Sequence, residues 1–275
     1  MTGGPFLPVR LPMYNWPEVR GATRDLERAL QRALVEVLDL DPSGFRAGGR
    51  TAEHVDHWTD PDLLLGQTCG YPLTHVLSGR VRLLGAPHYT APGCDGPFYC
   101  SHLVVRRGSA FQRMEDLRGR RAVFNGPDSQ SGMNALRHAV ALAGGRGTFF
   151  SSVTESGGHL KSMKAVAAGE ADIAAIDAVC WWLASRELPE LTADLCTIGR
   201  TEAAPGLPLI TSLRFSETEA GLMADVVEWV LNAPETVRSR ERLGLRGFSK
   251  LSLKEYARIP EMEAQAAGLG YPVLA

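Results

Sequence analysis

The segment whose residue types most clearly suit ligand binding is the loop at residues 125–132, with the sequence Asn-Gly-Pro-Asp-Ser-Gln-Ser-Gly. It follows an apolar run typical of a strand and precedes a run with helical spacing. Backbone N–H groups at a helix N-terminus have no partner inside the helix, and the helix dipole is positive there. With the hydroxyls of Ser129 and Ser131, these groups predict the binding of an anion without Lys or Arg. The alternative is that either serine only caps the helix.

Three more candidates follow predicted strands or precede a predicted helix. The loop 66–71 would present polar groups, or it is a tight surface turn; its candidates are Gln67, Thr68 and Gly70. His159 follows two glycines and could donate to an anion from a helix start, or serve as a cap or surface residue. Asp177 could accept a hydrogen bond from an amine or from a protonated oxyanion, or it caps the next helix.

Other sets of reactive residues have weaker support. His54 and His57 are three residues apart beside two carboxylates, so a metal site is geometrically conceivable, but a solvated helix face fits this polar segment better. Trios of Ser, His and Asp can be drawn, but no nucleophile motif accompanies them. We therefore expect no metal, no cofactor and no catalytic residues.

Composition excludes several classes of protein. The chain has 275 residues, 44% of them hydrophobic, and a net charge of −2, which argues against a nucleic-acid or membrane surface. Residues 1–16 show no basic start followed by an apolar stretch, so no signal peptide is expected in this chain. The five cysteines cannot all pair with one another, and none forms a C-x-x-C motif.

The candidate binding residues must be positioned by the surrounding strands and helices. The sequence pattern alternates between strands and helices, which predicts an α/β fold with doubly wound, mostly parallel sheets. We expect strands near residues 7–14, 62–66, 81–84, 103–105, 121–125, 149–153, 172–176, 196–201 and 209–213. Helices are expected near 26–38, 72–78, 132–142, 159–168, 178–186, 234–243 and 252–267. A capping box, Ser216-Glu-Thr-Glu219, opens one more helix after residue 216.

The proline-dense segment 204–208 predicts a linker between two lobes. We expect lobe 1 to comprise residues 1–102 and 205–275, and lobe 2 to comprise 103–204. The chain would then cross twice, near 100–103 and 200–207, and form a hinge. Closure of the lobes on a ligand in the crevice between them is the expected consequence.

Several short motifs, in order along nearly the whole chain, carry a family resemblance. They are Met13-Tyr14, Gln67-Thr-Cys-Gly-Tyr-Pro72, Tyr99-Cys-Ser-His-Leu-Val-Val105, Asp116-Leu-Arg-Gly119, Ser129-Gln-Ser-Gly132, Gly158-His159, Gly169-Glu-Ala-Asp172, Pro205-Gly-Leu-Pro208 and Gly247-Phe248. Through them the chain resembles the substrate-binding proteins of phosphate, phosphite and phosphonate ABC transporters. The resemblance implies a two-lobed type II periplasmic-binding-protein fold and a solute-binding protein that is not an enzyme.

The resemblance also implies a binding site. Ser129 and Ser131 would hold the phosphonate oxygens, and His159 and the Tyr99 region would complete the shell. Asp177 lies near the position at which family members that bind aminophosphonates have carboxylates on the second lobe. The full expected set is Tyr14, Gln67, Thr68, Gly70, Tyr99, Ser101, Ser129, Gln130, Ser131, Gly132, His159 and Asp177. We expect a monomer that binds a small anionic solute, contacts the membrane subunits of an ABC importer and binds no nucleic acid.

Alternatives remain open at this point. Without a signal peptide, the chain could be a cytosolic sensor rather than a periplasmic protein. An enzyme on the same fold could use Cys69 with His159 or His102. Family members carry similar cysteine pairings, which favour a disulfide between Cys69 and Cys94, with Cys94 to Cys100 or free thiols as rivals.

Overall fold

The computed structural model describes residues 9–41 and 57–275, which divide into two compact units. The first unit comprises the described residues up to Thr90 together with Pro205–Tyr256, and the second comprises Ala91–Ala204 and Ala257–Ala275. The expected two-unit α/β class is confirmed. The chain passes between the units three times, not twice, because residues 257–275 belong to the second unit. Residues 91–102 also belong there, in contrast to the predicted boundary.

The first unit is built on a five-stranded sheet of order β1-β2-β12-β3-β13. Its strands are β1 (Val9–Arg10), β2 (Leu65–Gln67), β12 (Leu209–Ser212), β3 (Val81–Tyr89) and β13 (Leu245–Ser249). Strand β12 lies between β2 and β3 and is antiparallel to both, and β13 is antiparallel to β3. Among the described residues of this sheet, only β1 and β2 pair in parallel. The expectation of a mostly parallel sheet is therefore wrong here, since strands from the returning chain pair with the early ones.

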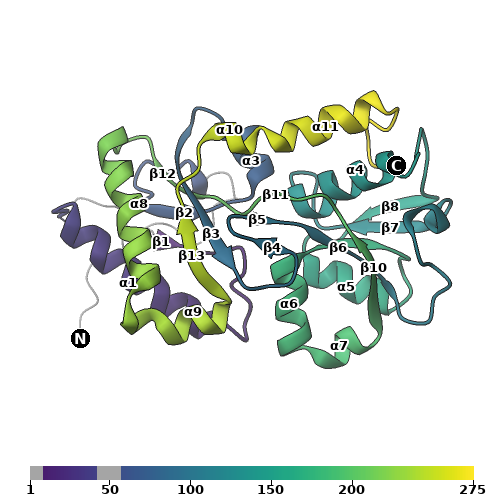
Figure 1. The fold of residues 1–275 in the computed structure, drawn as a ribbon, viewed down its shortest axis with the longest axis horizontal. Helices are drawn as coiled ribbons and strands as arrows, with labels where there is room; N and C mark the ends of the chain where they lie inside the picture. Colours follow the sequence, from purple (N-terminus) through teal and green to yellow (C-terminus); the bar gives the residue numbers. More distant parts are fainter. Residues whose placement is uncertain (1–8, 42–56) are drawn as a thin grey trace. The chain divides into compact units, whose positions relative to one another are not determined.

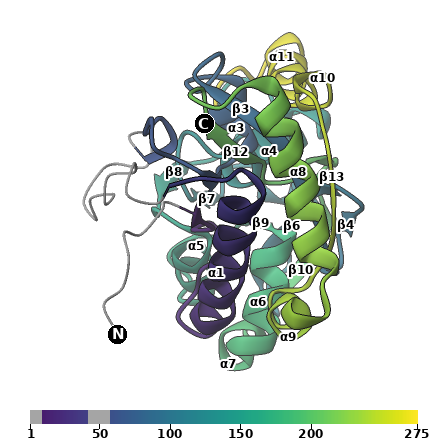
Figure 2. The ribbon, with the colours of Figure 1, turned by 90° about the vertical axis from the view of Figure 1, so that its left-hand side faces the viewer.

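Helices α1 (Arg20–Val37), α8 (Glu217–Asn232) and α9 (Val237–Leu243) pack against one another in this unit (Figure 2). The shorter helices are α3 (Gly70–Thr74), η4 (Pro234–Thr236) and α10 (Leu253–Tyr256). Helix α1 buries Leu26, Leu30 and Leu34, as its helical spacing predicts. The predicted capping box is confirmed, because the Ser216 hydroxyl accepts from the Glu219 N–H while the Glu219 carboxylate accepts from the Ser216 N–H.

The second unit contains the antiparallel sheet β10-β6-β9 and the parallel pair β7-β8. Figure 1 labels β6 and β10 of the sheet and both strands of the pair. Their bounds are β6 (Ser101–Arg106), β7 (Arg121–Phe124), β8 (Ser152–Glu155), β9 (Ala174–Asp177) and β10 (Leu195–Arg200). The hairpin β4 (Cys94–Asp95) and β5 (Phe98–Tyr99) is adjoined by β11 (Ala204–Pro205). The helical elements are η2 (Met114–Leu117), η3 (Gln130–Asn134), α4 (Ala135–Leu142), α5 (His159–Ala167), α6 (Ala178–Glu187), α7 (Pro189–Ala193) and α11 (Arg258–Gly268).

The C-terminal segment explains one difference from the predicted elements. Helix α11 packs against α4, and Tyr271 is fully buried in the core of the second unit. The predicted strand 149–153 begins only at Ser152, because the N–H groups of Phe149 and Phe150 both donate to the carbonyl of Ala275. Near the start of the chain, the predicted strand 7–14 is limited to Val9–Arg10 within the described residues.

Candidate functional site

The predicted anion loop connects β7 to α4 inside the second unit. The Ser129 hydroxyl accepts a hydrogen bond from the Gly132 N–H at 3.0 Å, so this serine does cap the following helix. Residues Gln130–Asn134 then form a π turn, in which the Asn134 N–H donates to the Ser129 carbonyl at 3.0 Å. Single π turns are rare and occur often at functional sites.

Ser131 and His159 come together from two different elements. Their side chains form a hydrogen bond of 2.8 Å between Oγ and Nε2, and His159 is the first residue of α5. Burial lowers the pKa of His159 to about 4, so its ring is neutral at pH 7. Its Nδ1 atom is buried and has no partner among the described residues. This pair can therefore offer neutral donors and acceptors to a ligand, without a fixed charge.

Ser101 and Gly132 hold this loop in place. The Ser101 hydroxyl donates to the Ser131 carbonyl at 2.9 Å, while its own N–H donates to the Thr201 hydroxyl at 2.9 Å. A Cβ atom on Gly132 would lie 1.8 Å from the Asn125 Oδ1 atom, so a larger residue would force the Asn125 side chain to move. The Ser101 side chain is thus brought to the loop, but its hydroxyl is already engaged with the protein.

Two predicted ligand residues have hydrogen-bond partners within the second unit. The Gln130 amide donates to the Met262 sulfur at 3.4 Å and accepts from Asn134 at 2.6 Å. The Asp177 carboxylate accepts from the N–H groups of Val179 and Cys180, which makes it the N-cap of α6. These contacts favour the alternative roles, loop support for Gln130 and helix capping for Asp177.

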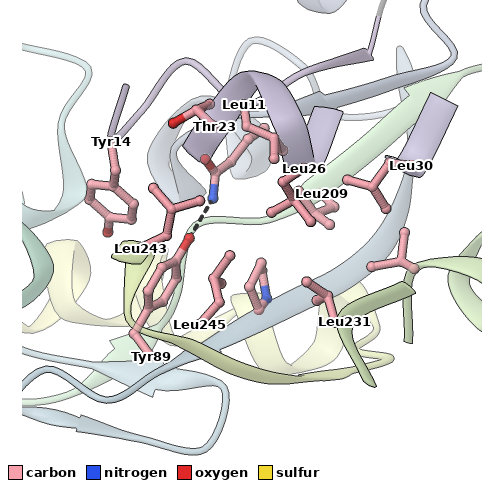
Figure 3. A pocket seen from close by; sticks show the side chains of 13 residues that line it. Leu11, Tyr14, Thr23, Leu26, Leu30, Tyr89, Leu209, Leu231, Leu243 and Leu245 are labelled. Atoms are coloured by element: carbon pink, nitrogen blue, oxygen red, sulfur yellow. Dashed lines mark hydrogen bonds between the residues drawn. The ribbon is translucent and has the colours of Figure 1, made fainter. Parts of the chain in front are cut away.

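Residues of the first unit form a separate group around Gln67. The Gln67 amide donates to the Tyr89 hydroxyl at 3.2 Å (Figure 3). The rings of Tyr14 and Tyr89 pack edge to face, with their centroids 5.2 Å apart. The Trp58 indole N–H donates to the Gln67 carbonyl at 3.1 Å. Tyr89 is not among the residues predicted from the sequence, because it lies at the end of β3 without any motif around it.

This group borders a small cavity inside the first unit, with a volume of about 30 Å³. Seven of the thirteen described residues that line it are leucines, which come from α1, α8, α9, the sheet and the segment before α1 (Figure 3). The cavity has room for little more than one water-sized group. Among the described residues, none that lines the cavity carries a charged side chain that could neutralise an anion.

The remaining first-unit candidates lie at the start of α3. Thr68 is fully buried, its N–H donates to the Pro208 carbonyl at 3.1 Å, and its hydroxyl has no partner among the described residues. Gly70 is the first residue of α3 and Cys69 is its N-cap.

The other predicted cysteine and aromatic positions belong to the second unit. Tyr99 is buried in β5, and Cys94 begins β4. The disulfide between Cys69 and Cys94 stays a prediction. Cys100 is a free, buried thiol whose pKa burial raises, so the rival pairing with Cys94 is absent.

No metal site is found within the part of the chain that the structure describes, where no three His, Cys, Asp or Glu residues cluster suitably. The metal candidate around His54 lies outside the described residues, apart from His57, whose ring nitrogens lie 3.2 Å from the Arg10 guanidinium.

In the described residues, no helix combines the length and the apolarity needed to cross a membrane.

Comparison with known proteins places these observations in a family context. Residues 66–256 match the family described as ABC transporter, phosphonate, periplasmic substrate-binding protein. No curated protein matches the sequence.

Three solved structures have a similar fold. PhnD1 from Prochlorococcus marinus, in complex with methylphosphonate, is 16% identical with a TM-score of 0.69, over 90% of this chain and 94% of that chain. A Xanthomonas citri protein bound to ATP, XAC2383, is 15% identical with a TM-score of 0.67, over 91% and 94%. A binding component of an ABC phosphonate transporter from Pseudomonas aeruginosa is 15% identical with a TM-score of 0.62, over 90% and 91%. At these identities the likeness shows a shared fold.

Proposed function

The chain belongs to the family of periplasmic substrate-binding proteins of phosphonate ABC transporters, and on that premise we propose that it binds a phosphonate- or phosphate-like oxyanion for import. Proteins of this family bind solutes and are not enzymes, so the alternative of a catalytic Cys69 is wrong. The sensor alternative stays a prediction, since a sensor would need the same binding and would differ only in its partner.

The observation that carries this proposal is the hydrogen bond between Ser131 and His159 at the start of two helices. The loop from Asn125 to Met133 contains no Lys or Arg. Its donors are hydroxyls, a neutral imidazole and backbone N–H groups, which point at fixed positions and suit the separate oxygens of a tetrahedral anion. A site of this kind selects its ligand by geometry more than by total charge.

The predicted ligand residues of the two units have different chemistry. The second unit supplies the hydroxyl and imidazole groups that suit oxygens, while Gln67, Tyr89 and Tyr14 border an apolar cavity. We assign the oxyanion to the Ser131 loop for this reason. The membrane subunits of an ABC importer would be the protein partners, and the periplasm would be the compartment.

Calorimetric titration of the full chain tests this function. Methylphosphonate, phosphite, phosphate and sulfate are compared under the same buffer, with the cation arginine as the control ligand. We expect saturable binding of at least one phosphorus oxyanion and none of arginine. Absence of binding to all three phosphorus compounds, or equal binding of sulfate and phosphorus anions, would contradict the proposal.

A further inference from the structure

A buried polar network connects the anion loop to the C-terminal helix, wholly within the second unit. Asn134, which is fully buried, donates through Nδ2 to the Gln130 side chain at 2.6 Å and to the Ile259 carbonyl at 3.1 Å. Its Oδ1 atom accepts from Arg137 at 2.6 Å. The partners of the Asn134 side chain therefore lie on α4, on α11 and in the turn itself.

Arg137 extends the network along α11 and beyond it. Its guanidinium pairs with the Glu263 carboxylate at 3.0 Å and donates to the Pro272 carbonyl at 3.0 Å. It is almost fully buried, which is rare for arginine unless the charge is paired. The sequence therefore places a chain of polar groups where apolar residues would ordinarily pack helix to helix.

The position of this network relative to the π turn suggests its role. Gln130 and Asn134 are the first and last residues of the turn, and Ser131 and Gly132 lie between them. A π turn is less favourable than a regular α-helical turn, so it needs outside support. The hydrogen bond between the Gln130 and Asn134 side chains joins the two ends of the turn. The hydrogen bond from Asn134 to the Ile259 carbonyl connects this pair to α11.

Buried polar pairs can often be replaced by apolar residues of similar size without loss of stability. Their presence here calls for an explanation other than stability. We propose that Asn134 is a positioning residue, which holds the Ser129–Gly132 loop in its binding conformation by fastening the π turn to α11. Without it, the turn relaxes toward a regular helix and the Ser131 hydroxyl leaves His159.

The location of Ile259 adds a consequence. Helix α11 starts two residues after the point where the chain enters the second unit for the last time, at Tyr256–Ala257. The acceptor of Asn134 is therefore close, along the chain, to a passage between the units.

The test replaces Gln130 and Asn134 by apolar residues of similar size in the full chain, as the double variant Gln130→Met with Asn134→Leu. We expect the protein to stay folded with a somewhat lower melting temperature, because the Ile259 carbonyl and Arg137 each lose a partner. The amides of residues 131–135 should exchange with solvent at least about ten-fold faster, because the turn opens locally. Methylphosphonate affinity should fall by about ten-fold or more. The affinity result rests on the proposed function, but the exchange result needs no ligand and judges the positioning role alone.

The matched control lies on the same two helices. His138 and Gln265 form a polar pair at 2.9 Å one turn farther from the loop, so His138→Leu with Gln265→Leu should leave loop exchange and affinity unchanged. A second variant, Asn134→Asp, keeps the shape and the Arg137 contact but removes the donor, and should also speed loop exchange. Unchanged exchange in both Asn134 variants would overturn the inference, and so would loss of folding in both, since the network would then support the core.

Discussion

Ser129 and Ser131 have the same side chain two residues apart, yet they have different partners. Ser129 caps a helix, whereas Ser131 contacts His159. Ser131→Ala should therefore weaken binding of a phosphorus oxyanion by about 1–3 kcal/mol, the usual loss of a hydrogen bond to a charged group. Ser129→Ala should instead lower the free energy of unfolding by about 0.5–2 kcal/mol.

Calorimetry for affinity and thermal or urea unfolding for stability distinguish the two effects. Each variant is the control for the other, because both remove one hydroxyl from the same loop. If Ser131→Ala binds like the wild type, the contact with His159 has no part in recognition.

His159 makes stability depend on pH in a defined window. Its pKa is about 4 in the folded protein because of burial, against about 6.5 in the unfolded chain. Between these values the unfolded chain binds a proton that the folded protein does not bind. The free energy of unfolding should therefore decrease as pH falls from 6.5 to 4, by at most about 1.4 kcal/mol per pH unit.

Urea unfolding of the wild type and of His159→Asn across pH 4–8 measures this contribution. The difference in stability between the two proteins should change below pH 6.5 and stay constant above it. A constant difference over the whole range would mean that burial does not shift the pKa of this ring.

At the scale of elements, the loop between β7 and α4 has no basic residue, so its donors are dipoles. Salt screens interactions between exposed charges far more than short hydrogen bonds to oriented neutral donors. Affinity for the oxyanion should therefore change less than about three-fold between 20 and 300 mM salt, at constant pH, on this screening argument. Calorimetry with a salt of weakly binding anions checks this, and a steep loss of affinity would point to long-range attraction by lysines or arginines elsewhere.

At the scale of the whole molecule, a solute that binds only the folded protein stabilises it by mass action. A concentration about 100 times the dissociation constant should add about 2.7 kcal/mol, which corresponds to a rise of roughly 5–10 °C in melting temperature. The rise should grow with ligand concentration and be much smaller for Ser131→Ala at the same concentrations. No rise at saturating ligand would contradict specific binding to the folded state.

Local patterns in the sequence were sufficient for several elements and for part of the site. The spacing of Leu26, Leu30 and Leu34 predicted α1, and the Ser216 capping box predicted the start of α8. The loop with Ser129 and Ser131 was recognised between a strand and a helix. Such features depend on residues within one or two turns of each other, so their physical causes are present in the sequence itself.

The tertiary structure decided which distant residues became partners. Strand β12 lies between β2 and β3. The N–H of Phe149 donates to the carbonyl of Ala275 and not to a neighbouring strand, and α11 belongs to the second unit. Likewise, the structure brings the Gln130 side chain into contact with Asn134 and Met262, which the sequence pattern did not predict. Each of these choices depends on which surfaces can be buried together and which polar groups remain to be satisfied, and residues far apart in the chain settle both.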